Sequence, residues 1–127
     1  MNSADMRALV ERYVGAYNRM NVAEMLLTVH PEVEFENISG GIVNASTSGV
    51  GEFEELAERS LALFSERHQE ILAFETTEDL AVVSIAFRAI VAEDLPNGLR
   101  KGQVLELSGR SEFEFSGERI VRIRDIS

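Results

Sequence analysis

The prediction of the fold starts from residues 31–37, which read P-E-V-E-F-E-N. Apolar and acidic residues alternate here, which is typical of a β-strand with one buried face. Val33, Phe35 and Asn37 share that face, and the glutamates between them share the other. Burying the Asn37 carboxamide costs free energy unless its donors and acceptor find partners, or unless a cavity holds water or a ligand there. Asn37 is therefore the first candidate for a residue of a binding site.

Composition limits the possible partners and compartment. The chain has 127 residues, 22 Asp and Glu against 12 Lys and Arg, a net charge of -10 and no cysteine. This length fits a single domain, residues 1–127, with one core. The negative charge argues against nucleic acid and anionic membranes and favours a neutral ligand. Without cysteine, thiol catalysis and disulfides are excluded. With no signal sequence or apolar span, we expect a cytoplasmic protein.

The N-terminal half predicts three helices. Apolar residues recur at helical spacing from Ser3, the expected cap, to Tyr17. Asn21, with Glu24 three positions later, predicts the start of a short second helix that Pro31 ends. Residues 38–49 are small and suit a turn or short hairpin. A third helix is expected from residues 49–51 to Phe64.

The C-terminal half has a period of two residues, which predicts an antiparallel meander. The expected strands are residues 68–76, 80–92, 103–115 and 119–126. Alternation points Ser111 inward in the third of these strands and Asp125 inward in the fourth. The expected fold class is α+β, with three helices on one face of a curved, mostly antiparallel sheet.

Four segments together resemble the nuclear transport factor 2-like superfamily, within it the SnoaL-like and ketosteroid-isomerase-like proteins. They are E-R-Y-V-G-A-Y-N at 11–18, V-E-F-E-N at 33–37, S-G-V-G-E-F at 48–53 and G-E-R-I-V-R-I-R-D at 117–125. The resemblance covers nearly the whole chain in element order. It implies a cone-shaped α+β fold, also called cystatin-like, whose sheet and helices enclose a deep apolar pocket. It also implies a homodimer formed through the outer face of the sheet.

The resemblance to ketosteroid isomerases assigns roles to three positions. Tyr13 falls where those enzymes place the tyrosine that donates to a developing oxyanion. Asn37 occupies the position of their general-base aspartate, and Ser111 that of their protonated aspartic acid. Because an amide does not accept a proton at neutral pH, Asn37 is not expected to be the base.

The resemblance to limonene-type epoxide hydrolases assigns different roles. Asn37 aligns with the asparagine that helps hold the attacking water, and Asp125 with the base aspartate. Phe35 stands where these enzymes have a water-binding tyrosine. Their arginine and second carboxylate fall near Ala86 and Arg88, so this set of residues is incomplete.

The strand pattern and these resemblances together predict the residues of the site. Tyr13, Asn37 and Asp125 are the catalytic candidates, with Asp125 as base. Arg88 is either a counter-ion to Asp125 or to an acidic ligand group, or an arginine of the outer sheet face. The other expected ligand-binding residues are Tyr17, Phe35, Phe53, Leu56, Phe87, Ser111, Phe113 and Val121.

Two functional hypotheses follow. One is a protein that binds a small, mainly apolar cyclic molecule, as an isomerase or epoxide-hydrolase-like enzyme that needs no cofactor. The other is a non-catalytic ligand-binding or dimerisation module. Two isolated histidines, His30 and His68, form no metal motif, so no metal site is expected. A continuous pocket that reaches Asn37 and Asp125 would favour chemistry.

Overall fold

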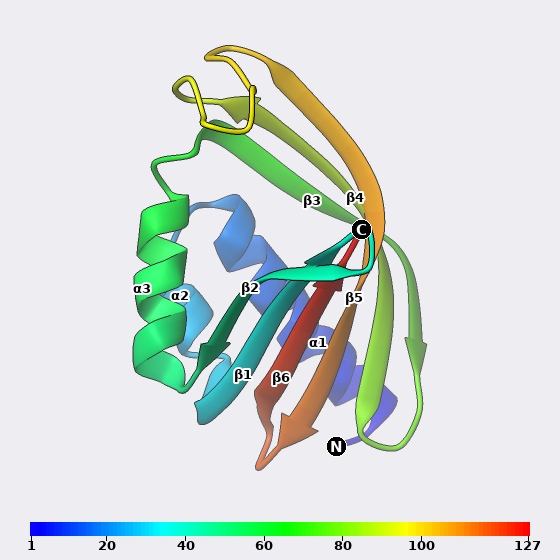
Figure 1. The fold of residues 1–127 in the computed structure, drawn as a ribbon. Helices are drawn as coiled ribbons and strands as arrows, with labels where there is room; N and C mark the ends of the chain where they lie inside the picture. The colour runs from blue at the N-terminus through cyan, green and yellow to red at the C-terminus, as the bar shows by residue number, and fades with distance from the viewer.

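A computed structural model describes residues 1–127, and in it three helices lie on one side of a strongly curved six-stranded sheet (Figure 1). The strand order is β2-β1-β6-β5-β4-β3. Helix α1 packs against α2 and β3, and α3 packs against β1 and β2. The elements are α1 (Ser3–Asn18), α2 (Val22–Leu26), β1 (Val29–Ser39), β2 (Ile42–Ser48), α3 (Val50–Ser60), β3 (Phe64–Thr76), β4 (Leu80–Val91), β5 (Val104–Ser116) and β6 (Arg119–Ile126).

The sheet is mixed, because its only parallel pairing joins the first strand to the last. β3, β4, β5 and β6 form the expected antiparallel meander, and β1 then pairs in parallel with β6. β1 also pairs with β2, so residues 42–48 form a strand at the edge of the sheet. The predicted α+β class is confirmed, as is the hairpin expected after the first strand.

The structure corrects three predicted helix boundaries: the start of α1, the end of α2 and the end of α3. The N-cap of α1 is Asn2, not Ser3, because the Asn2 side chain accepts the hydrogen bond from the Asp5 amide. The predicted Asn21 cap of α2 is confirmed by the bond from the Glu24 amide. Helix α2 ends at Leu26, well before Pro31, which lies inside β1.

The third correction changes which residues face the interior. Helix α3 ends at Ser60, so Phe64 does not belong to it but begins β3. The strand therefore starts four residues earlier than residue 68. Arg67 and Gln69 alternate inward with exposed Glu66, His68 and Glu70.

One buried cluster joins the helices to the concave face of the sheet. It includes Met6 and Val10 of α1, Val33 of β1, Phe113 of β5 and Ile123 of β6, all at most 1% exposed. The opposite face carries charges in rows across the strands. No helix covers that face, and no helix of the structure is long and apolar enough to cross a membrane.

The charges on the outer face pair with one another. Arg122 of β6 contacts Glu36 of β1 at 3.2 Å and Glu114 of β5 at 3.5 Å. Arg124 contacts Glu112 at 3.2 Å. Opposite charges on neighbouring strands support the β1–β6 and β5–β6 registers by modest amounts, about 0.2–1 kcal/mol per pair. This register decides which inward-facing residues become neighbours.

Candidate functional site

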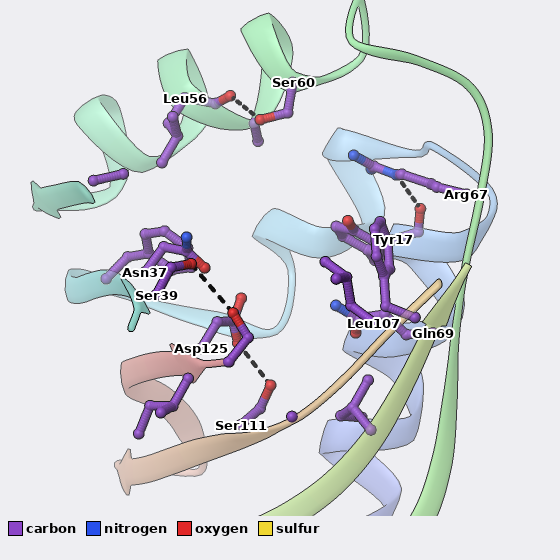
Figure 2. A pocket seen from close by; sticks show the side chains of 18 of the residues that line it. Tyr17, Asn37, Ser39, Leu56, Ser60, Arg67, Gln69, Leu107, Ser111 and Asp125 are labelled. Carbon is purple, nitrogen blue, oxygen red and sulfur yellow. Dashed lines mark hydrogen bonds between the residues drawn. The ribbon is translucent and has the colours of Figure 1, made fainter. Parts of the chain in front are cut away.

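A cavity of about 400 Å³ lies between the helices and the concave face of the sheet. All three helices and all six strands contribute to it, and most of its lining residues are hydrophobic. Figure 2 shows labelled polar side chains around it, with Asn37 and Asp125 on one side and Tyr17 and Arg67 on the other. The volume falls within the range of small-molecule sites, about 300–1,000 Å³. The cavity reaches both Asn37 and Asp125.

Asp125 is the only Asp or Glu side chain that lines this cavity. One of its oxygens, Oδ1, accepts a hydrogen bond of 2.6 Å from Ser111 Oγ, and the structure gives its other oxygen no protein donor (Figure 2). Burial raises the pKa of Asp125 to about 6, and the bond from Ser111 partly opposes this rise. Asp125 is therefore mostly ionised at neutral pH and is more basic than an ordinary aspartate.

Asn37 is the neighbour of Asp125 on the adjacent strand. The two are Cα partners in the parallel β1–β6 pairing, and both line the cavity. Asn37 Nδ2 donates to Asn44 Oδ1 of β2 at 2.7 Å, which orients the amide. Its carbonyl oxygen has no donor in the chain and is available to water or a ligand.

Tyr13 and Tyr17 project from α1 into the cavity, one helical turn apart. Burial, and secondly the negative charge of Asp125, raises the pKa of Tyr13 well above its usual range. Burial also raises the pKa of Tyr17 to about 12, although Arg67 acts in the opposite direction. Both hydroxyls therefore stay protonated at physiological pH and can donate hydrogen bonds.

Aromatic side chains hold the apolar walls in place. Phe53 of α3 packs 5.8 Å from Phe35 of β1 and 6.4 Å from Tyr13, measured between ring centroids. Phe87 of β4 packs 6.4 Å from Tyr17. Leu56 of α3 also lines the cavity. Such pairs add about 0.5–1.5 kcal/mol each beyond the burial of their area and so stabilise the walls.

Three residues expected in the pocket lie outside its lining. Phe113 is in the core, 1% exposed, with its ring against Tyr13 at a centroid distance of 5.8 Å. Arg88 is exposed and pairs with Glu106 at 3.8 Å. Its side chain therefore lies on the outer face of the sheet and does not pair with Asp125. Val121 lies at a bulge of β6, because Glu114 pairs with Arg122 whereas Phe115 pairs with Ile120.

Arg67 of β3 is a cavity residue that the sequence analysis missed. It is 6% exposed, its Nε donates to the Tyr17 carbonyl at 3.0 Å, and its guanidinium carbon lies 3.7 Å from the Tyr17 ring centroid (Figure 2). Gln69 and Ser60 line the same region. The alternation of Arg67, Gln69 and Ile71 in the sequence is consistent with an inward-facing Arg67. A strand predicted to start at His68 leaves Arg67 outside it.

Gly109 of β5 keeps the space beside Asp125 open for the end of the chain. A Cβ atom at this position would overlap the carbonyl oxygen of Ile126. Only glycine permits this close approach of two backbones. Ile126 follows Asp125 directly, so Gly109 helps to fix the position of the carboxylate.

The site therefore combines a basic carboxylate, a neighbouring amide and a protonated phenol in a largely apolar space. Such a set can move a proton and stabilise an oxyanion. No group of three or more His, Cys, Asp or Glu side chains in the structure could hold a metal ion.

The sequence of the chain matches one protein family. The model of the SnoaL-like domain family matches residues 10–123. A search of proteins with curated descriptions found no match.

Solved structures share the fold at low sequence identity. One is a protein from Xanthomonas campestris pv. campestris proposed to be a polyketide cyclase, with 18% identity, TM-score 0.85, 100% of this chain and 93% of the other covered. A second is an LEH-like epoxide hydrolase from Mycobacterium tuberculosis, with 14% identity, TM-score 0.78 and coverages of 98% and 83%. A third is TerC, co-crystallised with polyporic acid, with 14% identity, TM-score 0.78 and coverages of 96% and 90%.

Proposed function

The chain belongs to the SnoaL-like domain family, and on this premise we propose that it binds a small, mainly apolar cyclic molecule and transforms it by acid/base chemistry without a cofactor. The observation that carries the proposal is the environment of Asp125. Its carboxylate has a pKa of about 6, opens to an apolar cavity of about 400 Å³ and has one oxygen free of protein donors. A base with a pKa near the working pH combines availability with proton affinity.

In the proposed reaction Asp125 takes a proton from a bound water or from a substrate carbon. Ser111 holds one carboxylate oxygen, so the second oxygen is the one directed to the proton. The Asn37 carbonyl, beside it on β1, accepts a hydrogen bond from the water or orients the substrate. Tyr13 donates to the oxygen on which negative charge develops.

Two reaction types begin with this step. If Asp125 activates water, the product gains one water, as in epoxide hydrolysis. If it removes a proton from carbon and returns it elsewhere, the product is an isomer of the substrate. Neighbours of similar fold include an epoxide hydrolase and a proposed polyketide cyclase, which supports testing both.

The experiment begins with a thermal-shift screen of the purified protein against sterols, polyketide-like aromatics, terpene epoxides and fatty acids. A ligand at 100 times its dissociation constant stabilises the fold by about 2.7 kcal/mol. Each hit is then incubated with the protein, and the products are analysed by mass spectrometry. A gain of one water indicates hydrolysis, and an unchanged mass with a new retention time indicates isomerisation.

Variants of Asp125 decide the mechanism. Asp125→Asn should bind the same hits but lose turnover, since the amide is not a base. Asp79→Asn is the matched control, because Asp79 is exposed in the turn between β3 and β4. Turnover that persists in Asp125→Asn would eliminate Asp125 as the base. Hits that bind without any turnover in the wild type would favour the non-catalytic binding module.

We also propose that two copies associate through the outer face of the sheet. This face has no helix over it, and Arg122, Arg124, Glu36, Glu112 and Glu114 give it opposite charges that a second copy can complement. Light scattering should give twice the 14.1 kDa chain mass. Arg122→Glu should shift the protein to the monomer, and a monomeric wild type would contradict the proposal.

A further inference from the structure

The guanidinium of Arg67 is a buried charge that the structure leaves incompletely paired. It is 6% exposed, and its Nη2 atom is buried without any hydrogen-bond partner. Its Nε atom bonds to the Tyr17 carbonyl, which is a neutral acceptor. No carboxylate lies within ion-pair distance. An arginine stays charged at every physiological pH, so an uncompensated guanidinium in this position is costly for the fold.

The charge of Asp125 does not compensate Arg67. The two side chains lie on opposite sides of the cavity, with Tyr17 next to Arg67 (Figure 2). Burial raises the pKa of Asp125 and the Ser111 hydrogen bond lowers it, whereas the pKa values of Tyr13 and Tyr17 respond to both charges. The cavity thus has a positive end at Arg67 and a negative end at Asp125.

Several features give the positive end the form of an anion subsite. The face of the Tyr17 ring supports the guanidinium plane at 3.7 Å, and the Tyr17 carbonyl fixes Nε. Both contacts hold the arginine in place, and the buried Nη2 keeps its hydrogen-bonding capacity unused. Gln69, whose backbone is fixed by two hydrogen bonds with the Asn18 side chain, lines the cavity nearby. A planar oxyanion fits a guanidinium better than any other common group.

We propose that the natural ligand carries one carboxylate, which Nη2 of Arg67 binds at the α1–β3 side of the cavity, while its apolar ring extends toward Asp125. This inference rests on the proposed function only in placing the ligand in the same cavity. It departs from the neutral ligand expected from the overall charge of -10, because the local charge at this end is positive. Binding a carboxylate there compensates the guanidinium and fixes which part of the ring meets the base.

The test uses three pairs of probes that differ only in charge. They are benzoate and benzamide, 2-naphthoate and 2-naphthamide, and anthracene-2-carboxylate and its amide. Affinities are measured by calorimetry at pH 8, where all three acids are ionised. We expect at least one acid to bind the wild type about tenfold or more tightly than its amide, since charge-assisted hydrogen bonds are the stronger ones. No preference for the acid in any pair would overturn the proposal.

Variants identify the group responsible for the preference. Arg67→Met keeps an apolar stem and should abolish the preference for the acid. Arg88→Met is the matched control, since it also removes one positive charge but from the exposed outer face, and it should keep the preference. An unchanged preference in Arg67→Met would also overturn the proposal.

A second measurement covers the case in which Arg67→Met does not fold. In the wild type, the Nε–Hε resonance of Arg67 should shift on titration with the preferred acid and not with its amide. Asp125→Asn should keep the preference for the acid, because the carboxylate binds far from Asp125. Loss of turnover in Asp125→Asn with retained acid preference, or the reverse, therefore separates this inference from the proposed function.

Discussion

Asn37 and Asp125 are Cα partners in the parallel pairing of β1 with β6, so their side chains enter the same cavity from adjacent strands. The side chain next to the Asp125 carboxylate is thus a neutral amide, whereas a second carboxylate there would change the pKa of Asp125. A negative charge at position 37 would raise the pKa of Asp125 further and favour its protonated form. The amide therefore keeps Asp125 available as a base while still offering a hydrogen-bond acceptor.

The first prediction follows from this pairing. Asn37→Asp should move the pH at which Asp125 ionises above 6, since two carboxylates on adjacent strands resist ionising together. The apparent pKa can be measured from the carboxyl carbon resonance of Asp125 by NMR. Asn44→Ala, which removes only the hydrogen-bond partner of Asn37, is the control and should leave the pKa nearly unchanged. An unaltered pKa in Asn37→Asp would mean that the two side chains do not interact.

The second prediction concerns stability and pH. Burial raises the pKa of Asp125 from 3.8 to about 6, so between these values the folded protein binds more protons than the unfolded chain. The free energy of unfolding contributed by this group therefore falls as pH rises through that window.

Asp125→Asn should consequently be more stable than the wild type at pH 8, by about 1–3 kcal/mol, because it removes a buried charge and keeps the acceptor for Ser111. The gain should disappear near pH 3.5, where both proteins are neutral at this position. Urea unfolding at the two pH values measures the difference. A variant less stable than the wild type at pH 8 would contradict the assigned cause.

The third prediction separates the chemistry of Tyr13 from its packing. Tyr13→Phe should lower kcat by roughly 10²–10³-fold with little change in KM, as for the loss of one oxyanion donor. The ring contacts with Phe53 and Phe113 remain, so the melting temperature should change little. Tyr17→Phe, which keeps the ring under Arg67, is the control and should affect kcat less. A Tyr13→Phe enzyme within twofold of the wild-type kcat would remove Tyr13 from the mechanism.

The fourth prediction tests the close approach at Gly109. Gly109→Ala should destabilise the fold by about 1–3 kcal/mol, since its methyl group meets the Ile126 carbonyl and the backbone must shift. The amide resonances of Ile126 and Ser127 should move most.

Gly51→Ala is the matched control for this variant. Gly51 lies in the first turn of α3 with open space at its Cβ, so alanine should not destabilise the fold. Equal effects of the two substitutions would show that the contact between Gly109 and Ile126 does not determine the stability loss.

The local pattern of the sequence determined the elements and the direction of many side chains. Alternation in P-E-V-E-F-E-N and in the last two strands predicted that Asn37, Ser111 and Asp125 face inward, and the structure places all three in the cavity lining. The expected bounds of the last strand, residues 119–126, agree with β6. Such patterns suffice because a strand has a fixed period and one buried face.

Tertiary structure alone decided which of these side chains meet. The parallel β1–β6 register makes Asn37 and Asp125 neighbours, and a bulge removes Val121 from the cavity lining. The early start of β3 brings Arg67 next to Tyr17 of α1, in the lining of the cavity. Registers and bulges depend on hydrogen bonds between strands distant in sequence, and burial depends on what packs above them. The sequence therefore determined the parts of the site, and long-range pairing decided its arrangement.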